Sequence, residues 1–287
     1  MKDYVAENER ILNEWCKKFV EEKKHDEAYR GYVIERYFAK DGIMFKGEIV
    51  PKPIKYENGD EVFRWERKPS GKENELWSKE PLRVLFLTKD QNTSGDVAWD
   101  VRGETFRYPD VKYQPNAMCL YTQNTFFRNL VYSFYGIMKT IAGCPKNYDD
   151  FTNEEALALA DEMIFARINC KKEVGSDKCY DNVLRNAIEN DKMFLKQQIE
   201  NLDADIFMCC SYSQSIENTG NRMLNLLIEI GYQFKPEVED WIYYDEKRNK
   251  IAINSYHLSF PQFNYQGMVS AYSEFLKKHP DFTKSHR

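Results

Sequence analysis

Residues 82–92 constrain the fold of this chain more than any other stretch. Five of the six residues 82–87 are apolar, and polar residues follow from Thr88 onward. A short, continuous apolar run is typical of a central parallel strand that is covered on both faces. Because ligands bind just beyond the carboxyl ends of such strands, we expect chemistry in the polar residues. An ordinary solvated strand exit is the alternative. The residues concerned are Lys89, Asp90, Gln91 and Asn92.

Strands and helices alternate along the rest of the chain. Further strands are expected at about 164–170, 205–210, 241–244 and 250–254. Helices are expected at about 125–140, 152–163, 181–201, 220–230 and 266–278. This alternation predicts a parallel sheet with right-handed crossovers. The expected fold class is α/β, a three-layer α/β/α sandwich around a central, mainly four-stranded parallel sheet.

The first 80 residues do not follow this alternation. Amphipathic spacing predicts a helix at about 4–24, and a second helix is expected at about 26–38. Asn58-Gly59 between two runs of apolar and aromatic residues predicts a β-hairpin. We therefore expect residues 1–80 to form a helical and hairpin extension. It would pack on a main domain of residues 81–287.

Composition limits the classes of protein and site. The chain is 42% hydrophobic, yet no run approaches the roughly 18 apolar residues of a membrane span, and the N-terminus has no signal-peptide core. We expect a cytoplasmic monomer with no membrane partner. The seven cysteines have no regular spacing and form no Cys-x-x-Cys pair, which argues against a disulfide framework, a zinc site or an iron–sulfur cluster. No metal or cofactor is expected.

Charge does not favour a nucleic-acid surface over the whole molecule. The net charge is −5, although a local groove can be basic on an acidic protein. The long connection from Thr93 to Met118 combines aromatic residues with Arg102 and Arg107, which suits base stacking and phosphate contact. The same residues suit a loop pinned by its own side chains.

Four expected strands end in polar clusters. The clusters are 89–92, 169–171, 211–213 and 256–259. Because the carboxyl ends of parallel strands meet at one edge of a sheet, we expect these clusters to converge. This convergence is the main physical argument for a functional site.

The order of these motifs resembles the uracil-DNA glycosylase superfamily. A strand ending in Asp90 is followed by a Phe-rich helix, a strand ending in Asn169, an apolar strand, and a strand ending in His257-Leu258-Ser259. The resemblance covers roughly residues 81–278. It implies a four-stranded parallel sheet between helices and hydrolysis of an N-glycosidic bond to uracil or another modified base in DNA. No metal or cofactor is implied.

The resemblance also implies roles for particular residues. Asp90 is similar to the acid that assists water, and His257 to the histidine that stabilises the leaving base. Asn169 would read the base edge and Phe126 or Phe127 would stack on the base, with Gln91, Asn92 and Ser259 nearby. The implied contacts to nucleic acid are Lys89, Arg102, Arg107, Lys171 and Lys172. Lys89, Gln91 and Leu258 depart from the superfamily's motifs, so the chain would be a divergent member.

Each residue also has a purely structural explanation. Asp90 can cap a turn, Asn169 can satisfy loop backbone, and His257 can be a hydrogen-bonded histidine at a strand end. One of the two phenylalanines is expected in the core, and Lys171-Lys172 suits a solvated pair.

Two other functions therefore stay open. One is a protein of the same fold that binds a nucleobase, nucleotide or nucleic acid without catalysis. The other is an unrelated α/β hydrolase, although the chain has neither a Gly-x-Ser-x-Gly elbow nor a phosphate-binding Gly-x-x-x-x-Gly-Lys loop.

Overall fold

The computed structural model describes residues 2–55, 61–91, 97–106, 124–175, 179–215, 218–260 and 263–284. Within this part of the chain, an eight-stranded sheet has the order β1-β5-β4-β6-β10-β9-β8, with β7 paired to β6. Its centre consists of β5 (Ala166–Asn169), β4 (Val84–Thr88), β6 (Ile206–Ser215) and β10 (Lys250–Tyr256). Neighbouring strands among these four pair in parallel. The expected α/β class is confirmed, with a mixed and largely parallel sheet.

The sheet is wider than the sequence pattern predicted, because short strands extend it on both sides. The β1 strand (Gly42–Ile43) pairs antiparallel with β5, and β9 (Ile242–Asp245) pairs antiparallel with β10. Beyond these, β8 (Lys235–Val238) pairs with β9, and β7 (Asn218–Asn221) pairs with β6. Strand β9 lies where a strand was expected at about 241–244, whereas β1, β7 and β8, with two to four residues each, carry too little periodicity to be recognised from sequence.

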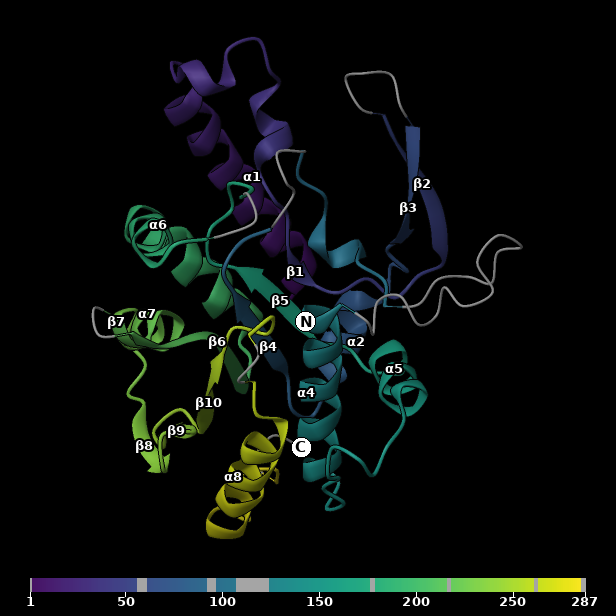
Figure 1. Ribbon diagram of the computed structural model, residues 1–287, viewed down its shortest axis with the longest axis vertical. Helices are drawn as coiled ribbons and strands as arrows, with labels where there is room; N and C mark the ends of the chain where they lie inside the picture. The colour runs from purple at the N-terminus through teal and green to yellow at the C-terminus, as the bar shows by residue number, and fades with distance from the viewer. Residues whose placement is uncertain are drawn as a thin grey trace.

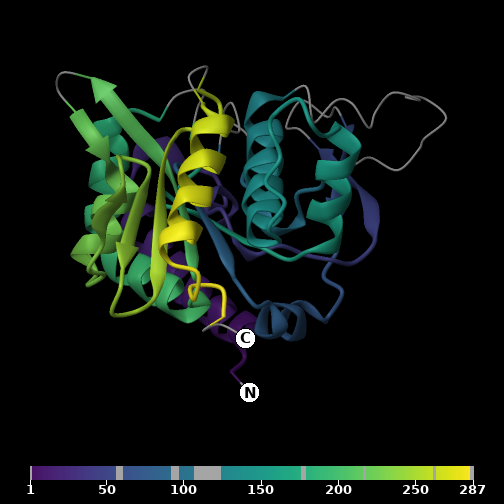
Figure 2. The ribbon, with the colours of Figure 1, turned by 90° about the horizontal axis from the view of Figure 1, so that it is seen from below.

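Helices lie on both sides of this sheet. Figure 1 shows α6 (Asp181–Leu202) and α7 (Arg222–Glu229) on one side, with α4 (Thr125–Ile141) and α8 (Tyr265–Lys278) on the other. Helices α4 and α8 run side by side (Figure 2), and α5 (Asn153–Glu162) packs on α4. The side chains of Val84, Leu85, Phe86 and Leu87 are fully buried. The apolar run therefore forms the central strand that its pattern predicted.

The N-terminal segment is tied directly into the sheet. Helix α1 (Tyr4–Lys23) packs on α6, where the rings of Trp15 and Phe194 stack at 5.5 Å, and β1 forms part of the main sheet. The strands β2 (Ile49–Lys55) and β3 (Glu61–Arg67) pair as the expected hairpin, followed by α2 (Glu73–Lys79). The Asn58-Gly59 turn lies outside the described residues.

One expected helix is wrong. Residues 26–38 form two short 3₁₀ turns, η1 (Glu27–Tyr29) and η2 (Ile34–Tyr37). Between them Gly31 adopts φ +82°, in the left-handed region that ends a right-handed helix. In the part of the chain that the structure describes, none of the helices has the length and apolar character needed to cross a bilayer.

Candidate functional site

Three strand ends bring polar and aromatic side chains together at one edge of the sheet. Thr88 at the end of β4 is the register partner of Asn169 at the end of β5, and His257 follows β10 directly. The ring centroids of His257 and Phe126 are 5.6 Å apart, and the Arg167 guanidinium lies 4.7 Å from the centre of the Phe126 ring. We call Thr88, Phe126, Arg167, Asn169 and His257 the strand-end cluster.

Only the oxygen of the Asn169 side-chain amide has a hydrogen-bond partner among the described residues. The side chain is fully buried, and its Oδ1 accepts a 2.6 Å hydrogen bond from the Thr88 hydroxyl. Its Nδ2 is buried and has no hydrogen-bond partner among the described residues. A buried donor without a partner costs folding free energy. A ligand carbonyl that accepts a hydrogen bond from Asn169 Nδ2 would remove this cost and so bind more tightly.

The Arg167 side chain packs against one face of the Phe126 ring. Its guanidinium is buried, pairs with the Glu104 carboxylate at 2.5 Å, and donates to the Thr88 hydroxyl at 3.1 Å. The Phe126 ring covers the guanidinium at cation–π distance. A buried, paired arginine thus fixes both the aromatic ring and the hydroxyl that holds Asn169.

The structure separates the two phenylalanines that sequence left undecided. Phe126 contacts the His257 ring and Arg167, whereas the Phe127 ring packs against Phe106 at 5.7 Å. The side chain of Asn124 caps α4 by accepting from the Phe126 peptide N–H, which fixes the start of the helix. Phe126 is therefore the aromatic residue of the cluster.

His257 is neutral at physiological pH. Burial, together with the positive charges of Lys89 and Arg167, lowers its pKa to about 4. Its Nδ1 faces the Ser259 peptide N–H at 3.3 Å and accepts a hydrogen bond, so the ring proton is assigned to Nε2. A neutral imidazole with a proton on Nε2 can donate to a negatively charged oxygen. The Ser259 side chain itself is exposed.

Asp90 lies just past β4, beside Lys171 and Gly175. Its carboxylate is 3.4 Å from the Lys171 ammonium, which also donates to the Glu173 carbonyl. A Cβ at Gly175 would clash with Asp90 Oδ2, so a side chain at this position would displace the carboxylate or the backbone. The Asp90 carboxylate therefore lies between the Lys171 ammonium and the backbone of Gly175.

Two other residues of the same loop have different surroundings. Gln91 is buried and fixes the chain at Trp99 by donating to its carbonyl and accepting from its N–H, both at 3.0 Å. These two contacts give Gln91 a structural role in fixing the loop. Lys89 is partly exposed and lies close enough to His257 to lower its pKa. Asn92 lies outside the described residues.

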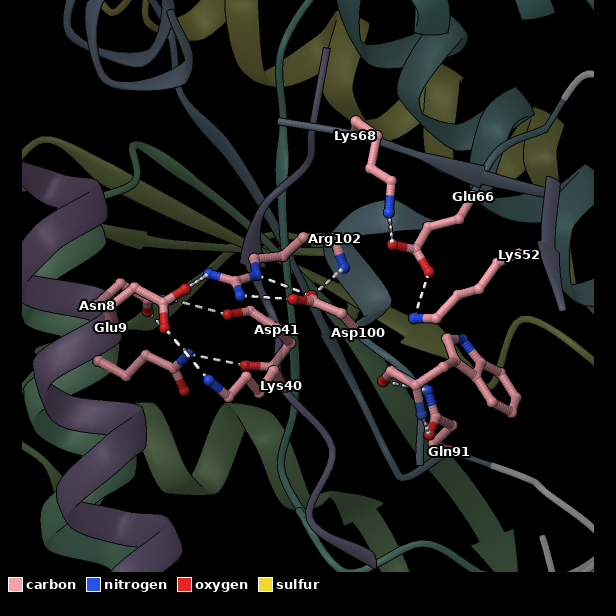
Figure 3. A network of polar contacts seen from close by, with 12 residues as sticks. Asn8, Glu9, Lys40, Asp41, Lys52, Glu66, Lys68, Gln91, Asp100 and Arg102 are labelled. Carbon is pink, nitrogen blue, oxygen red and sulfur yellow. Dashed lines mark hydrogen bonds and ion pairs between the residues drawn. The ribbon is translucent and has the colours of Figure 1, made fainter. Parts of the chain in front are cut away.

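The expected basic groove needs correction. The Arg102 guanidinium is buried and paired with Asp100 and Glu9 (Figure 3), so it is not available to a phosphate. Lys172 is 2% exposed and pairs with Asp41 at 2.5 Å, so it is neither a phosphate contact nor a solvated residue. Burial lowers the pKa of Lys172, and the Asp41 carboxylate opposes that shift. Lys171 is also buried, and Arg107 lies outside the described residues.

The expected third strand-end cluster, 211–213, lies within a strand. Strand β6 continues to Ser215 and pairs with β7, and the Ser211 hydroxyl donates to Asn221 Oδ1 at 2.6 Å. Asn221 in turn caps α7 and donates to the Cys209 carbonyl. Ser211 and Asn221 therefore hold the start of α7 against β6.

Sequence reasoning missed Thr88, Glu104 and Arg167. A signal for Arg167 was present, since it is a charged residue inside the apolar run 164–168. A charge within a buried strand needs a partner, and Glu104 provides it. Nothing in the sequence pairs Glu104 with Arg167, because 62 residues separate them.

Comparison with family models and with curated proteins gives no relative from which an identity could be assigned. The residues above are therefore the basis for any assignment of function. The chain matches no family model and no curated protein.

Proposed function

We propose that this chain is an N-glycosylase that hydrolyses the bond between uracil, or another modified base, and its sugar in DNA. One observation carries the proposal. An aromatic ring (Phe126) lies 5.6 Å from a neutral imidazole (His257), and Arg167 links that ring to an amide donor without a partner among the described residues (Asn169). These are the three groups that a flipped-out base requires: a stacking face, an edge reader and a donor to the leaving base.

The chemistry assigns a role to each group. Breaking the C1′–N bond develops positive charge on the sugar and negative charge on the base. The Asp90 carboxylate would stabilise the sugar cation and orient the water whose oxygen bonds to C1′. His257 Nε2–H would donate to the oxygen of the departing base, which takes up the proton that the water loses. A neutral histidine suits this role because it stabilises the anion by a hydrogen bond.

Binding would use the other two groups. Asn169 Nδ2 would donate to a carbonyl on the base edge, and stacking on an aromatic ring such as Phe126 contributes about 1–3 kcal/mol per base. Among the predicted contacts to nucleic acid, Lys89 is partly exposed and would meet the DNA backbone, whereas Arg102 and Lys172 are paired inside the protein. The proposal also keeps four expectations from the sequence. The fold would be a three-layer sandwich around four parallel strands, and the process would be DNA repair. The protein would be cytoplasmic and monomeric.

A strand-cleavage assay tests the proposal. Single- and double-stranded oligonucleotides carrying uracil or other modified bases are incubated with the protein, and abasic sites are converted to breaks by alkali. We expect breaks at one modified base, at least about 100-fold fewer with Asp90→Asn, and fewer with His257→Ala. Equal cleavage by wild type and Asp90→Asn would contradict the assigned mechanism.

One observation favours a second candidate, a base-binding protein without catalysis. Lys171 occupies the side of Asp90 at 3.4 Å and competes with a sugar cation for the carboxylate. This candidate predicts base-dependent binding of oligonucleotides by fluorescence anisotropy, with no abasic sites and no effect of Asp90→Asn. The same two assays therefore separate the candidates.

A further inference from the structure

We propose that Asp41, in the N-terminal segment, is a positioning residue that fixes the base-reading Asn169, with Lys172 as its partner. The inference rests on the proposed function, since it assigns a role to residues that support Asn169. It also gives residues 1–80 a task in the site. Neither Asp41 nor Lys172 belongs to the strand-end cluster itself.

The contacts define a clamp on the Asn169 peptide. Asp41 is fully buried, and its Oδ2 accepts from the Asn169 peptide N–H at 2.8 Å and from Lys172 Nζ at 2.5 Å. Lys172 Nζ also donates to the Asn169 carbonyl at 3.0 Å. One ion pair therefore holds both backbone groups of Asn169, while Thr88 holds the side-chain oxygen.

Further contacts hold Asp41 itself. Gln198 on α6 donates to Asp41 Oδ1 at 2.7 Å, and Asn8 on α1 donates to the Asp41 carbonyl at 2.8 Å (Figure 3 shows Asn8 beside Asp41). Gln198 also donates to Asn8 at 3.0 Å. The next residue, Gly42, has φ +136° and lies against the Asn8 amide, where a side chain would not fit. Helices α1 and α6 thus place Asp41 beneath Asn169.

Stability alone is a poor explanation for this pair. Two buried charges must be removed from water, and replacing such a pair by apolar residues of similar volume is often neutral or stabilising. A hydrogen bond from a peptide N–H to a carboxylate is directional, so it fixes the orientation of that peptide as well as stabilising it. The geometry accordingly points to orientation of Asn169, whose Nδ2 is left as the donor without a partner.

A combined variant of Asp41 and Lys172 separates an effect on the orientation of Asn169 from an effect on folding. Asp41→Asn alone leaves Lys172 charged and unpaired, so a loss of activity could reflect unfolding. Asp41→Leu with Lys172→Met removes both charges and both contacts to the Asn169 peptide. We expect it to fold with a lower Tm than wild type, because the Asn169 peptide and the Gln198 amide lose partners but no buried charge is left unpaired. We expect its kcat/KM for the preferred base to fall about 10- to 100-fold, as when a reacting geometry shifts by about 1 Å. Discrimination against other bases should fall as well.

Two controls make the test specific to Asn169. In an Asn169→Ala background the combined variant should cause no further loss, because a residue that acts only through Asn169 has nothing left to position. Asp205→Asn is the matched control, since Asp205 is a buried carboxylate paired with Arg83 and Lys250 at the opposite edge of the sheet. It should lower Tm and leave base discrimination unchanged.

The outcomes separate this inference from the proposed function. A folded Asp41→Leu/Lys172→Met variant with wild-type rate and discrimination would overturn the inference and leave the glycosylase intact. A further loss in the Asn169→Ala background would overturn it too. If the wild type binds without cleaving, base discrimination in oligonucleotide affinity is the readout for the same variants. A wild type with neither turnover nor base-dependent binding would overturn the proposed function and the inference with it.

Discussion

At the scale of single residues, His257 is the side chain whose ionisation most affects the proposed chemistry. Burial and two nearby cations lower its pKa to about 4, against 6.5 for an unperturbed histidine. The imidazole that faces Phe126 is therefore a hydrogen-bond donor and not a cation at neutral pH. Lys89 and Arg167 repel a second proton on the ring and so keep it neutral.

This pKa predicts a pH dependence with a definite sign. The unfolded chain binds a proton at His257 below about pH 6.5 and the folded protein only below about pH 4. Between these values the unfolded state holds more protons, so the contribution of His257 to stability is full above pH 6.5 and is lost as pH falls through 4. Titration by NMR should give a His257 midpoint near 4. A midpoint near 6.5 would contradict the assigned environment.

Gly175 offers a second prediction at this scale. Its missing side chain makes room for the Asp90 carboxylate, so Gly175→Ala must displace Asp90 or the backbone. We expect turnover to fall about tenfold or more, because the carboxylate leaves its position by a fraction of an ångström. Gly71→Ala is the control for a glycine change: it has φ +78° but open space around it, so stability falls and turnover does not.

At the scale of elements, the start of α4 determines where Phe126 lies. Asn124 Oδ1 accepts from the Phe126 peptide N–H at 3.0 Å and caps the helix. Asn124→Ala should lower the free energy of unfolding by about 1 kcal/mol, measured by urea titration. It should also weaken oligonucleotide binding, because the first turn carries the stacking ring. Thr152→Ala, which removes the cap of α5, should cost similar stability without weakening binding.

Elements with strong periodicity could be predicted from sequence, whereas the short strands β1, β7 and β8 could not. The helices expected at about 125–140 and 152–163 and the strand expected in the apolar run 82–87 appear as α4, α5 and β4. Strand β1 has two residues and owes its existence to pairing with β5. Residues 26–38 have helical spacing, but Gly31 overrides it. Local pattern therefore determined the long elements, and tertiary contact determined the short ones.

The site follows the same division. Asp90, Asn169 and His257 could be predicted as candidates because each lies at or just past the end of a recognisable strand, and parallel topology brings strand ends together. The partners of these residues could not, since Thr88, Glu104 and Asp41 act through contacts between distant segments. Lys172 shows the opposite error. Its charge suggested a phosphate contact, but burial beside Asp41 makes it an internal residue.

At the scale of the whole molecule, residues 1–80 are part of the main fold. They contribute β1 to the sheet, Asp41 to the support of Asn169, and the buried residues Leu12, Trp15 and Phe19 to the core. A separable extension would contribute no strand to the sheet, no support to Asn169 and no residue to the core. The chain should accordingly fold as one cooperative unit.

Deletion of residues 1–80 tests this integration. We expect the remainder to lose cooperative thermal unfolding by circular dichroism, because the buried edge of β5 and one face of α6 would be exposed. A control shortens the β2–β3 hairpin so that a two-residue turn joins Pro53 to Phe63, which face each other in the ladder. That variant should unfold like wild type. A cooperative, soluble fragment 81–287 would contradict the prediction.

The most direct test of the glycosylase proposal is a mass measurement on both products. An oligonucleotide with one modified base is incubated with the protein and examined by mass spectrometry without alkali. We predict a strand in which the base is replaced by a hydroxyl group, together with an equal amount of the free base, and neither product with Asp90→Asn. An intact strand with every base tested, at concentrations where the oligonucleotide is bound, would contradict the proposal and leave base binding as the function of the strand-end cluster.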